Sequence, residues 1–393
     1  MKQTPNNQNT IAVLFGGRSS EHEISLRSAV FILKNIPEKY FILPVGISRK
    51  GEFLSLTGQF TRNEFSQITT EHLAQIIEGK VPALFPESQN IQSTFLPLRN
   101  ETLTQNILKN SSLRILNAES FCVFPVLHGT NGEDGRLQGL LELAELAYVG
   151  CDIRASVIGI DKDIQKRLAR DAGIPIARYE VIELEELEKK EDLVIKRIEK
   201  NLGYPCFVKP NAMGSAVGAS IAKNSRDLKI ALKEATAFDT KALVEELLVG
   251  TEVECAFLGT SIFPRITCAG EIAPKEFYSY EEKYGAESKV MQYIPARLSE
   301  TRMNELKNLA LRIVKTMGIS GFSRIDFWNI TKTEQFIFNE FNTIPGLTSI
   351  SMFPKLWEEE KVFGNEWIEE LIQKAIHRKN ILDRAQYGIK AEI

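Results

Sequence analysis

The stretch FNEFNTIPG, residues 338–346, has the apolar spacing of a buried strand but sets a carboxylate and an amide side by side. Because residues i and i+2 of a strand point to the same side, Glu340 and Asn342 share one face and Phe341 lies on the other. The Pro-Gly pair that follows ends the strand in a turn. The apolar side chains that suit a buried strand are Phe338, Phe341 and Ile344.

A second stretch, GFSRIDFW at 321–328, has the same form, with Arg324 and Asp326 on one face and Ile325 opposite. If the two strands pair through the turn NITKTEQ, one sheet face presents two carboxylates, an amide and a guanidinium. Hard oxygen ligands suit Mg²⁺, which uses one or two carboxylates together with substrate phosphates. The arginine suits a developing negative charge. The spacing alone fits a solvated face with surface ion pairs equally well.

The composition restricts the class of protein. A chain of 393 residues favours two or three domains, because one domain spans about 100–200 residues. The net charge of −3 gives no electrostatic reason to expect nucleic acid. No run approaches the ~18 apolar residues of a membrane span, and the N-terminus lacks the apolar core of a signal peptide. The five cysteines form no CxxC pair, which favours reduced thiols and a cytoplasmic location.

The N-terminal part alternates strand and helix signals, which predicts an α/β sheet. The apolar run IAVLF at 11–15 precedes two glycines, as a buried parallel strand does before a tight turn. Residues 54–117 show no firm period and are interpreted as an excursion from the sheet. The other elements expected here are helices at 25–33 and 138–146 and strands at 40–48 and 121–127.

The remaining chain predicts two further units, preceded by an amphipathic helix at 161–172. The middle unit is expected to be a small antiparallel sheet, with strands at 204–210, 220–223 and 242–247 and a helix near 226–237. The last unit is expected to contain a helix at 299–317 and strands at 254–259, 322–328 and 335–342.

The loop NAMGSAVG at 211–218 resembles a phosphate cradle, in which backbone N–H groups approach an anion. A glycine-bearing hairpin is the simpler interpretation of the loop alone, but Lys209 in the apolar strand before it needs an anionic partner. The segment VEELLVGTE at 244–252 fits a nucleotide-contacting linker, with Glu252 directed at a ribose. A plain strand and turn with exposed glutamates explains that segment as well.

Two polar segments lie near predicted strand ends. GGRSSEHEIS fits an N-capped helix in which Ser20 and Glu23 form a capping box. His128, in VLHGTNGEDG, follows a strand at the place where α/β folds bind ligands. A structural histidine explains that position equally simply.

Six motifs in this order closely resemble the D-alanine–D-alanine ligases, an ATP-grasp family: GGRSSEHEIS, VLHGTNGEDGRLQGLLE, FVKPNAMGSAVGAS, FYSYEEKY, GFSRIDFW and NEFNTIPGLTSISMFP. The resemblance covers about residues 11 to 357 and is weak at 54–117. It implies an α/β fold of three domains in ATP-grasp architecture: an N-terminal parallel-sheet domain that binds substrate at 1–155, a central subdomain with the phosphate loop at 156–246, and a C-terminal subdomain with the metal site and lid at 247–393.

The resemblance also assigns roles to single residues. The implied ATP-binding residues are Lys162, Lys209, Gly214, Glu245, Leu248 and Glu252. The implied magnesium ligands are Asp326, Glu340 and Asn342, and the implied oxyanion site is Arg324 with the Gly346 N–H. A hydrogen-bonded trio would span the three domains: Glu21, which receives the ammonium of the first substrate, Ser215 and Tyr284. The implied substrate contacts are His128 for the first substrate and Lys283, Ser351 and the Met352 backbone for the carboxylate of the second.

The implied reaction joins two D-alanines for peptidoglycan precursor synthesis. It uses ATP and two Mg²⁺ ions, for which Mn²⁺ can substitute, and passes through an acylphosphate. Such phosphoryl transfer needs positioning and charge neutralisation more than a covalent nucleophile. Water must be kept from the acylphosphate, which makes SYEEKYGAES a candidate lid. The resemblance further implies a homodimer, and neither nucleic acid nor membrane is an expected partner.

Two positions depart from the family pattern. Ala216 stands where many relatives have a second serine, which removes a hydroxyl donor, and Glu246 stands where some relatives carry lysine, which puts an adenine contact in question. The alternative functions are ligation of D-alanine to D-serine or to D-lactate, and, in another class, ATP binding without catalysis. Tyr284 argues against D-lactate, because such ligases typically carry histidine in the lid. The presence of Arg324 and every metal ligand argues against a non-catalytic protein.

Overall fold

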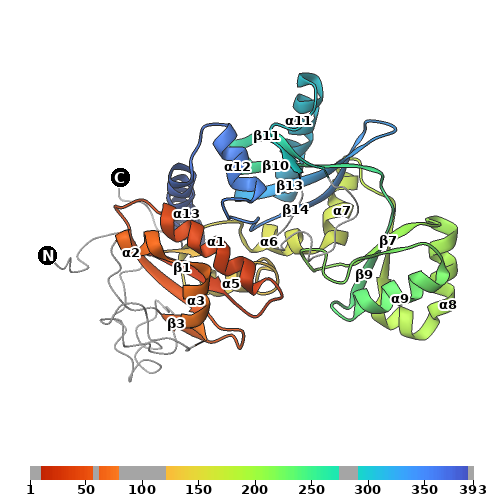
Figure 1. Ribbon diagram of the computed structural model, residues 1–393, viewed down its shortest axis with the longest axis horizontal. Coiled ribbons are helices and arrows are strands. Elements are labelled where there is room, and N and C mark those ends of the chain that lie inside the picture. The colour runs from red at the N-terminus through yellow and green to blue at the C-terminus, as the bar shows by residue number, and fades with distance from the viewer. Residues whose placement is uncertain (1–9, 56–61, 79–120, 274–290, 388–393) are drawn as a thin grey trace.

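The computed structural model describes residues 10–55, 62–78, 121–273 and 291–387. Three sheets lie along its long axis (Figure 1). The N-terminal sheet is at one end, a four-stranded sheet is at the other, and a five-stranded antiparallel sheet lies between and above them. This order agrees with three predicted units, although the domain boundaries at 155/156 and 246/247 stay a prediction.

The N-terminal sheet has the order β3-β2-β1-β4-β5, and its four strands other than β3 run parallel. Its central strand β1 is fully buried, because helices cover both faces, and this explains the unbroken apolar run in the sequence. The predicted parallel sheet is therefore confirmed. The strands are β1 (Thr10–Gly16), β2 (Phe41–Ile47), β3 (Phe53–Ser55), β4 (Phe121–Pro125) and β5 (Ala147–Tyr148). The helices that belong to it are α1 (His22–Asn35) and α5 (Arg136–Leu143).

The first part of the predicted excursion is structured. It contains β3 and two short helices, α2 (Arg62–Gln67) and α3 (Thr70–Ile77), whose apolar side chains Phe65, Leu73 and Ile77 join the core under α1. These helices have too few turns to give a firm sequence period, which is why they were not predicted. Residues 79–117 of the excursion lie outside the described residues.

The four-stranded sheet has the order β6-β9-β7-β8 and is antiparallel throughout, as predicted. Helices α8 and α9 cover one face and enclose a separate apolar core. The phosphate-cradle loop connects β7 to β8 as a hairpin. The elements are β6 (Tyr179–Glu183), α8 (Leu184–Asn201), β7 (Cys206–Pro210), β8 (Ser220–Ala222), α9 (Ser225–Thr236) and β9 (Lys241–Glu246).

The five-stranded sheet has the order β12-β11-β10-β13-β14. Helices α7 and α11 pack on its apolar face, and α6 leads from the N-terminal sheet to α7. The strands are β10 (Gly250–Gly259), β11 (Pro264–Ala273), β12 (Met291–Tyr293), β13 (Gly321–Ile330) and β14 (Phe336–Asn342). The helices are α6 (Ile153–Ile160), α7 (Lys162–Asp171) and α11 (Glu300–Met317).

A β-bulge interrupts the pairing of β13 with β14. Asp326 is opposite Glu340, but the next residue, Phe327, is opposite Phe338, so Asn339 has no opposite residue. A regular strand would place Phe338 on the same face as Glu340. The bulge reverses that alternation, and Phe338 and Phe341 are both buried in the core. The sequence predicted both aromatic side chains as buried but offered no account of their odd spacing.

The C-terminal helices return to the N-terminal sheet. α12 (Met352–Glu359) and α13 (Gly364–Tyr387) contribute buried aromatic side chains to the core that contains β1 and α1. Trp367 stacks on Phe31 of α1 with ring centroids 6.0 Å apart. Arg378 donates hydrogen bonds to the carbonyls of Tyr148 and Gly150, which ties α13 to the end of β5. The last part of the chain thus joins the first and last units.

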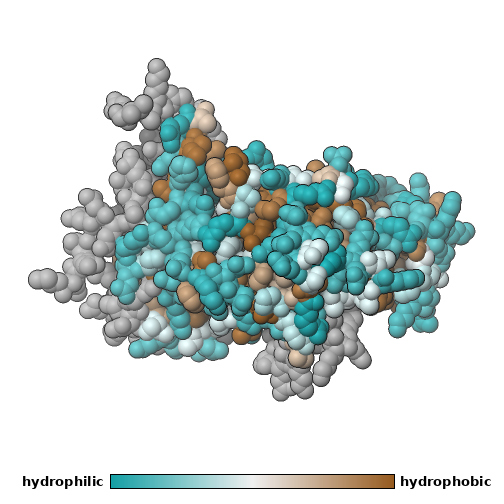
Figure 2. Space-filling model, turned by 90° about the horizontal axis from the view of Figure 1, so that it is seen from above, coloured by the Kyte–Doolittle hydropathy of each residue, from teal (hydrophilic) through white to brown (hydrophobic). Residues whose placement is uncertain are grey.

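The surface drawn in Figure 2 is mainly hydrophilic, with hydrophobic residues in separate patches. Within the described part of the chain, the helices are too short or too polar to cross a membrane.

Candidate active site

The polar face of the five-stranded sheet brings the motifs FNEFNTIPG and GFSRIDFW together. Asp326 pairs in register with Glu340, and Arg324 pairs with Asn342, so the predicted pairing of the strands is confirmed. Arg324 donates from Nε and Nη2 to the two oxygens of Asp326 at 2.8 and 2.7 Å. Asn342 Nδ2 donates to the same carboxylate at 2.9 Å. Asp326 is 1% exposed, which rules out the alternative of a solvated face.

A third strand adds carboxylates to this face. Glu254 of β10 lies opposite Asp326 and is 2% exposed, and Glu252 lies one step further along the same strand. The carboxylates of Glu252, Glu254 and Asp326 offer oxygens within 4.8 Å of one another. Burial raises the pKa of Asp326, while the neighbouring Arg324 opposes the rise. The sequence missed Glu254, although its spacing of two from Glu252 was a signal that both share one face.

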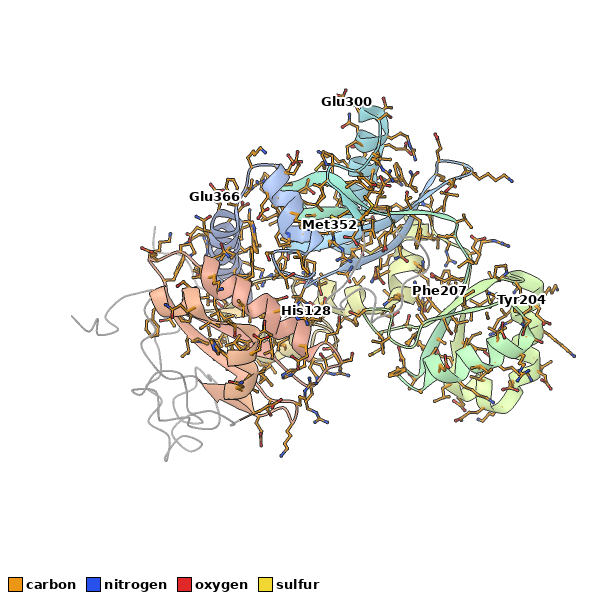
Figure 3. The ribbon with its side chains drawn as sticks, in the orientation of Figure 1. His128, Tyr204, Phe207, Glu300, Met352 and Glu366 are labelled. Carbon is orange, nitrogen blue, oxygen red and sulfur yellow. The ribbon has the colours of Figure 1, made fainter. Side chains whose placement is uncertain are left out.

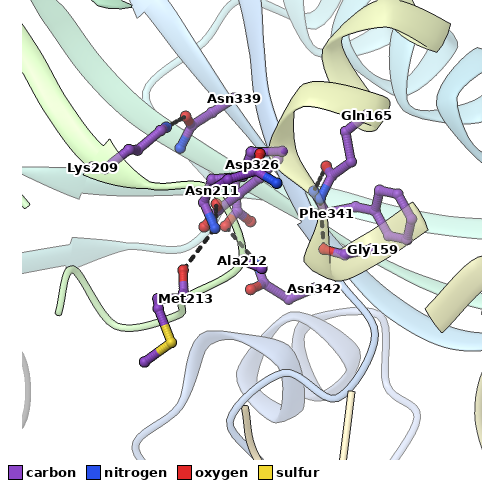
Figure 4. A network of polar contacts seen from close by, with 12 residues as sticks. Gly159, Gln165, Lys209, Asn211, Ala212, Met213, Asp326, Asn339, Phe341 and Asn342 are labelled. Atoms are coloured by element: carbon purple, nitrogen blue, oxygen red, sulfur yellow. Dashed lines mark hydrogen bonds and ion pairs between the residues drawn. The ribbon is translucent and has the colours of Figure 1, made fainter. Parts of the chain in front are cut away.

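A buried ion-pair cluster lies between α7 and the four-stranded sheet. Glu245 of β9 accepts Lys166 Nζ at 2.6 Å and Lys209 Nζ at 2.8 Å. Burial alone would raise the pKa of Glu245, but the two ammonium groups outweigh it and lower that pKa to about 2. Lys209 Nζ also lies 3.5 Å from Oδ1 of Asn339, the residue at the bulge (Figure 4). Lys166 was not predicted, although it lies four residues after Lys162 on the same face of α7.

The loop 211–218 is held at the N-terminus of α7. Lys162 donates to the carbonyl of Met213 at 2.7 Å and pairs with Glu340 Oε2 at 3.4 Å. Ser215 and Ala216 both have a positive φ, near +55°, so two successive residues adopt the left-handed conformation. Together with the hydrogen bond from the Val217 N–H to the Gly214 carbonyl at 3.2 Å, this backbone has the form of a tight type I′ hairpin turn, which requires a positive φ at both central residues. The loop geometry therefore agrees with the simpler hairpin interpretation, and phosphate binding by this loop stays a prediction.

Glu21 joins the N-terminal sheet to this loop. Ser215 Oγ donates a hydrogen bond to its carboxylate. A Cβ atom at Gly129 would lie 2.5 Å from that carboxylate and one at Gly214 would lie 3.0 Å away, so both glycines are needed for the close approach. Burial raises the pKa of Glu21, and the bond from Ser215 opposes the rise.

Helix α1 starts before the predicted range of 25–33, but later than a cap at Ser20 would place it. It begins at His22, and Glu21 occupies the N-cap position without a side-chain cap hydrogen bond. The predicted capping box of Ser20 and Glu23 is therefore wrong. The N-cap residue instead extends its carboxylate to the loop that contains Ser215.

His128 connects the N-terminal sheet to the turn after β14. Its Nδ1 lies 2.9 Å from the carbonyl oxygen of Ile344, and its Nε2 lies 2.9 Å from Ser28 Oγ. The Ile344 carbonyl can only accept, so the ring proton resides on Nδ1, and the unprotonated Nε2 accepts the proton of Ser28 Oγ, which itself accepts the N–H of Leu347 at 3.3 Å. Figure 3 shows His128 at the edge of the N-terminal sheet that faces the rest of the molecule. Both ring nitrogens therefore serve to hold the turn.

Glu133 holds the same turn from a second side. Its carboxylate accepts the N–H of Ile344 at 2.9 Å and that of Gly129 at 2.7 Å, and Thr343 Oγ1 lies 3.4 Å away. Burial, together with the nearby Glu21, raises the pKa of Glu133 to about 8. The sequence did not single out Glu133, although it lies in the same loop as His128. Loop and turn are thus clamped together at the N–H and carbonyl of one residue, Ile344.

His128 is expected to remain neutral well below pH 6. Burial lowers the pKa of His128 to about 4, below the ordinary 6.5, so the unfolded chain binds a proton between those values and the folded protein does not. The contribution of His128 to the free energy of unfolding is complete above pH 6.5. It decreases by roughly 3 kcal/mol in total as the pH drops to about 4. Nitrogen NMR of labelled histidine should show His128 as the Nδ1–H tautomer at pH 5, with the exposed His377 as reference in the same sample. A protonated His128 at that pH would contradict the assignment.

The turn after β14 brings Gly346 against the start of α12. A Cβ atom at Gly346 would lie 2.9 Å from Ser351 Oγ, so a side chain there would displace the Ser351 hydroxyl. Ser351 is the N-cap residue of α12, and its Oγ lies 2.7 Å from Thr348 Oγ1. Met352 begins that helix, and its backbone N–H lies in the first turn, where helix ends attract carboxylates.

Comparison with known proteins places this geometry in one family. The family description "D-ala D-ala ligase N-terminus" matches residues 10–151, and "D-ala D-ala ligase C-terminus" matches residues 168–373. The D-alanine--D-alanine ligase of Caldicellulosiruptor bescii is 42% identical over 96% of this chain and 98% of that protein. That of Legionella pneumophila is 37% identical over 94% and 96%. The chain belongs to the D-alanine–D-alanine ligase family.

Solved structures agree with this assignment. The D-alanine-D-alanine ligase from Coxiella burnetii has a TM-score of 0.76 and 30% identity over 97% of this chain and 99% of that chain. The VanG D-Ala:D-Ser ligase from Enterococcus faecalis has a TM-score of 0.77 and 34% identity over 94% and 100%. The predicted family, its ATP-grasp fold and an ATP-dependent ligase activity are therefore confirmed.

In a D-alanine–D-alanine ligase the linker between β9 and β10 is the expected adenine site. Leu248 lies in this linker and Glu252 follows on β10, where it is buried. Glu246, the departure from the family pattern, pairs with Arg178 at 2.8 Å, and its own N–H binds the Arg178 carbonyl. Its carboxylate is thus held by the protein itself, which argues against a contact with adenine.

The structure assembles most of the residues that the sequence singled out. Glu21, Lys162, Ser215, Glu340 and Asp326 are linked through hydrogen bonds, ion pairs and strand register, whereas Lys283 and Tyr284 lie outside the described residues. The contact of the third member of the trio therefore stays a prediction, as do the individual roles.

Proposed function

We propose that this chain joins two D-alanine molecules into D-alanyl-D-alanine and converts ATP to ADP and phosphate, as a step toward peptidoglycan precursors. The observation that supports this best is the meeting of three units at one place. Glu21 of the N-terminal unit contacts Ser215 of the phosphate loop, and Lys162 beside that loop pairs with Glu340 on the C-terminal sheet. An amino-acid site, a phosphate site and an acidic site are thereby adjacent.

In the first half-reaction, a carboxylate oxygen of the first D-alanine attacks the γ-phosphorus of ATP. The bond from that phosphorus to the bridging oxygen breaks, and ADP leaves with the electron pair. Glu21 fits the ammonium of this substrate, because it is a buried carboxylate beside a hydroxyl donor. Lys162, Lys209 and the backbone of 211–218 neutralise phosphate charge, which is the main requirement of such transfer.

The acidic face fits magnesium. Asp326 and Glu340 supply carboxylate oxygens, Asn342 supplies an amide carbonyl when its side chain turns, and Glu252 and Glu254 enclose the same place. An all-oxygen donor set suits a hard divalent cation, so two Mg²⁺ ions, or Mn²⁺, are the cofactor that we propose. Held by these residues, such ions would neutralise the charge of the phosphate oxygens.

In the second half-reaction, the amine of the second D-alanine attacks the acyl carbon. A tetrahedral species forms, phosphate leaves with the electron pair of its bond, and the proton lost by the amine passes to the departing phosphate. The guanidinium of Arg324 and the N–H of Gly346 face the developing oxyanion, while Ser351 and the first N–H groups of α12 suit the second carboxylate. The clamp of His128 and Glu133 on Ile344 keeps Gly346 in place, two residues beyond.

A product assay tests the proposal and the choice of second substrate. The purified protein is given ATP, Mg²⁺ and D-alanine, with D-alanine, D-serine or D-lactate in excess as acceptor, and products are read by mass spectrometry with released phosphate. D-Alanyl-D-alanine is expected to predominate. A larger yield of the serine product would instead support the activity for which the Enterococcus faecalis relative is named, and the absence of any dipeptide or ester would favour ATP binding without catalysis.

We further propose a cytoplasmic homodimer. The five cysteines are all buried free thiols, which is consistent with a reducing compartment. The dimer rests on the family resemblance alone, and sedimentation of the purified protein tests it.

A further inference from the structure

Glu254 has no role in the two half-reactions, yet it lies in the middle of the acidic face. It is 2% exposed, and its Oε2 lies 3.1 Å from Nε of Arg324. The strand register places it opposite Asp326, two residues before Ala256, which lies opposite Arg324. A buried carboxylate is costly unless a cation neutralises it, so the pairing with Arg324 explains why it is tolerated there.

Arg324 is gripped by two carboxylates along one edge. Asp326 accepts from Nε and Nη2, and Glu254 pairs with Nε from the neighbouring strand. Among the described residues, none forms a hydrogen bond with the third nitrogen, Nη1, and the side chain remains 21% exposed. The edge of the guanidinium that carries Nη1 is therefore directed away from the two carboxylates.

Asp326 cannot hold Arg324 fully while it also serves in its other proposed role, as a metal ligand. Both of its oxygens bind Arg324, and one also accepts from Asn342, although Asp326 is a proposed metal ligand. A carboxylate that turns toward a divalent cation releases part of its hold on the guanidinium, and the cation repels Arg324 in addition. A second carboxylate from β10 counters both effects.

We propose that Glu254 is a positioning residue that keeps Arg324 at the oxyanion site while Asp326 serves the metal. This inference rests on the proposed ligase function. It acts through charge and orientation on Arg324, and Glu254 itself does not touch the substrate. Arg324 with one carboxylate would be displaced, and misplacement of a catalytic group by about 1 Å costs on the order of 100-fold in rate.

The test compares Glu254→Gln with a matched control. Glutamine keeps the size of the side chain and removes its charge. The control is Glu271→Gln. Glu271 is also a buried strand glutamate, and it pairs with an arginine, Arg297, at 2.5 Å. It lies on β11, next to Gly270, which is the residue opposite Glu254. We expect Glu254→Gln to lower kcat by about 10–100-fold with KM for ATP changed less than about threefold. The control should retain kcat within about twofold.

A second measurement does not depend on activity. Nitrogen NMR of the arginine Nε–H groups is recorded on the metal-free protein, and the Arg324 signal is identified by its loss in Arg324→Lys. In Glu254→Gln this signal should be shifted and broadened. In Glu271→Gln it should be unchanged. Normal kcat in Glu254→Gln, or an Arg324 signal identical to wild type, would overturn the inference. If wild-type protein forms no dipeptide, the proposed function fails, and the NMR comparison still decides the role of Glu254.

Discussion

Replacement of Glu340 by alanine is expected to abolish ATP-dependent phosphate release, with a loss of at least about 1,000-fold, and to leave the fold intact. Glu340 is 23% exposed and projects from β14 toward Lys162, away from the core formed by Phe338 and Phe341. Its removal therefore leaves no cavity in that core. It does remove a carboxylate from the face that we propose to hold magnesium, and magnesium would in turn neutralise phosphate charge during transfer. The measurement is phosphate release under saturating ATP, Mg²⁺ and D-alanine.

Glu180→Ala is a matched control for this prediction. Glu180 is a strand glutamate that is 22% exposed and pairs with Arg197 at 3.3 Å, but it lies on β6, outside the acidic face. This variant should turn over like wild type, and both variants should melt within a few degrees of it. Wild-type-like turnover by Glu340→Ala would refute the metal assignment, and loss of folding in that variant would refute the claim that the side chain is not structural.

Replacement of Glu245 by glutamine is expected to destabilise the protein by about 3–5 kcal/mol, because it leaves buried charges without a partner. The side chain of Lys166 is 1% exposed and that of Lys209 is 9% exposed, so water can solvate neither ammonium group fully. At neutral pH an uncharged glutamine would lie between two buried ammonium groups, whose mutual repulsion the carboxylate of Glu245 now offsets. Denaturant unfolding, followed by fluorescence, measures the loss.

The neighbouring residue supplies the control. Glu246 also pairs with a cation, but it is 28% exposed and Arg178 is 64% exposed, so Glu246→Gln should cost only about 0–1 kcal/mol. The pair Lys166→Met with Glu245→Gln should recover part of the lost stability, because it removes one of the two unpaired charges. A Glu245→Gln protein as stable as wild type would show that Lys166 and Lys209 reach solvent or another partner.

Several parts of the fold were determined by the sequence locally. The apolar run at 11–15 predicted a buried parallel strand, and β1 is one. The alternation in GFSRIDFW put Arg324 and Asp326 on one face, and they are in contact there. Asp161 and Gly173 marked the ends of α7 within one or two residues. These features succeed because strand period, helix caps and glycine turns act over a few neighbouring residues.

Other parts depended on contacts between distant segments. The bulge at Asn339 is held by packing of Phe338 against β13 and by the bond of the Phe341 N–H to Gln165 on α7 (Figure 4). The carboxylate of Glu21 has its hydrogen-bond partner in Ser215, almost two hundred residues away. The clamp on Ile344 depends on a loop more than two hundred residues earlier.

The sequence by itself thus predicted most of the candidate site residues and the strand face or loop on which they lie. Only the tertiary structure decided how those faces meet. It paired β10 with β13, which brought Glu254 to Arg324, and it enclosed Lys166 and Lys209 around one carboxylate. The physical reason is that local backbone preferences act over a few residues, whereas burial and charge pairing are settled by whichever segments come together in space.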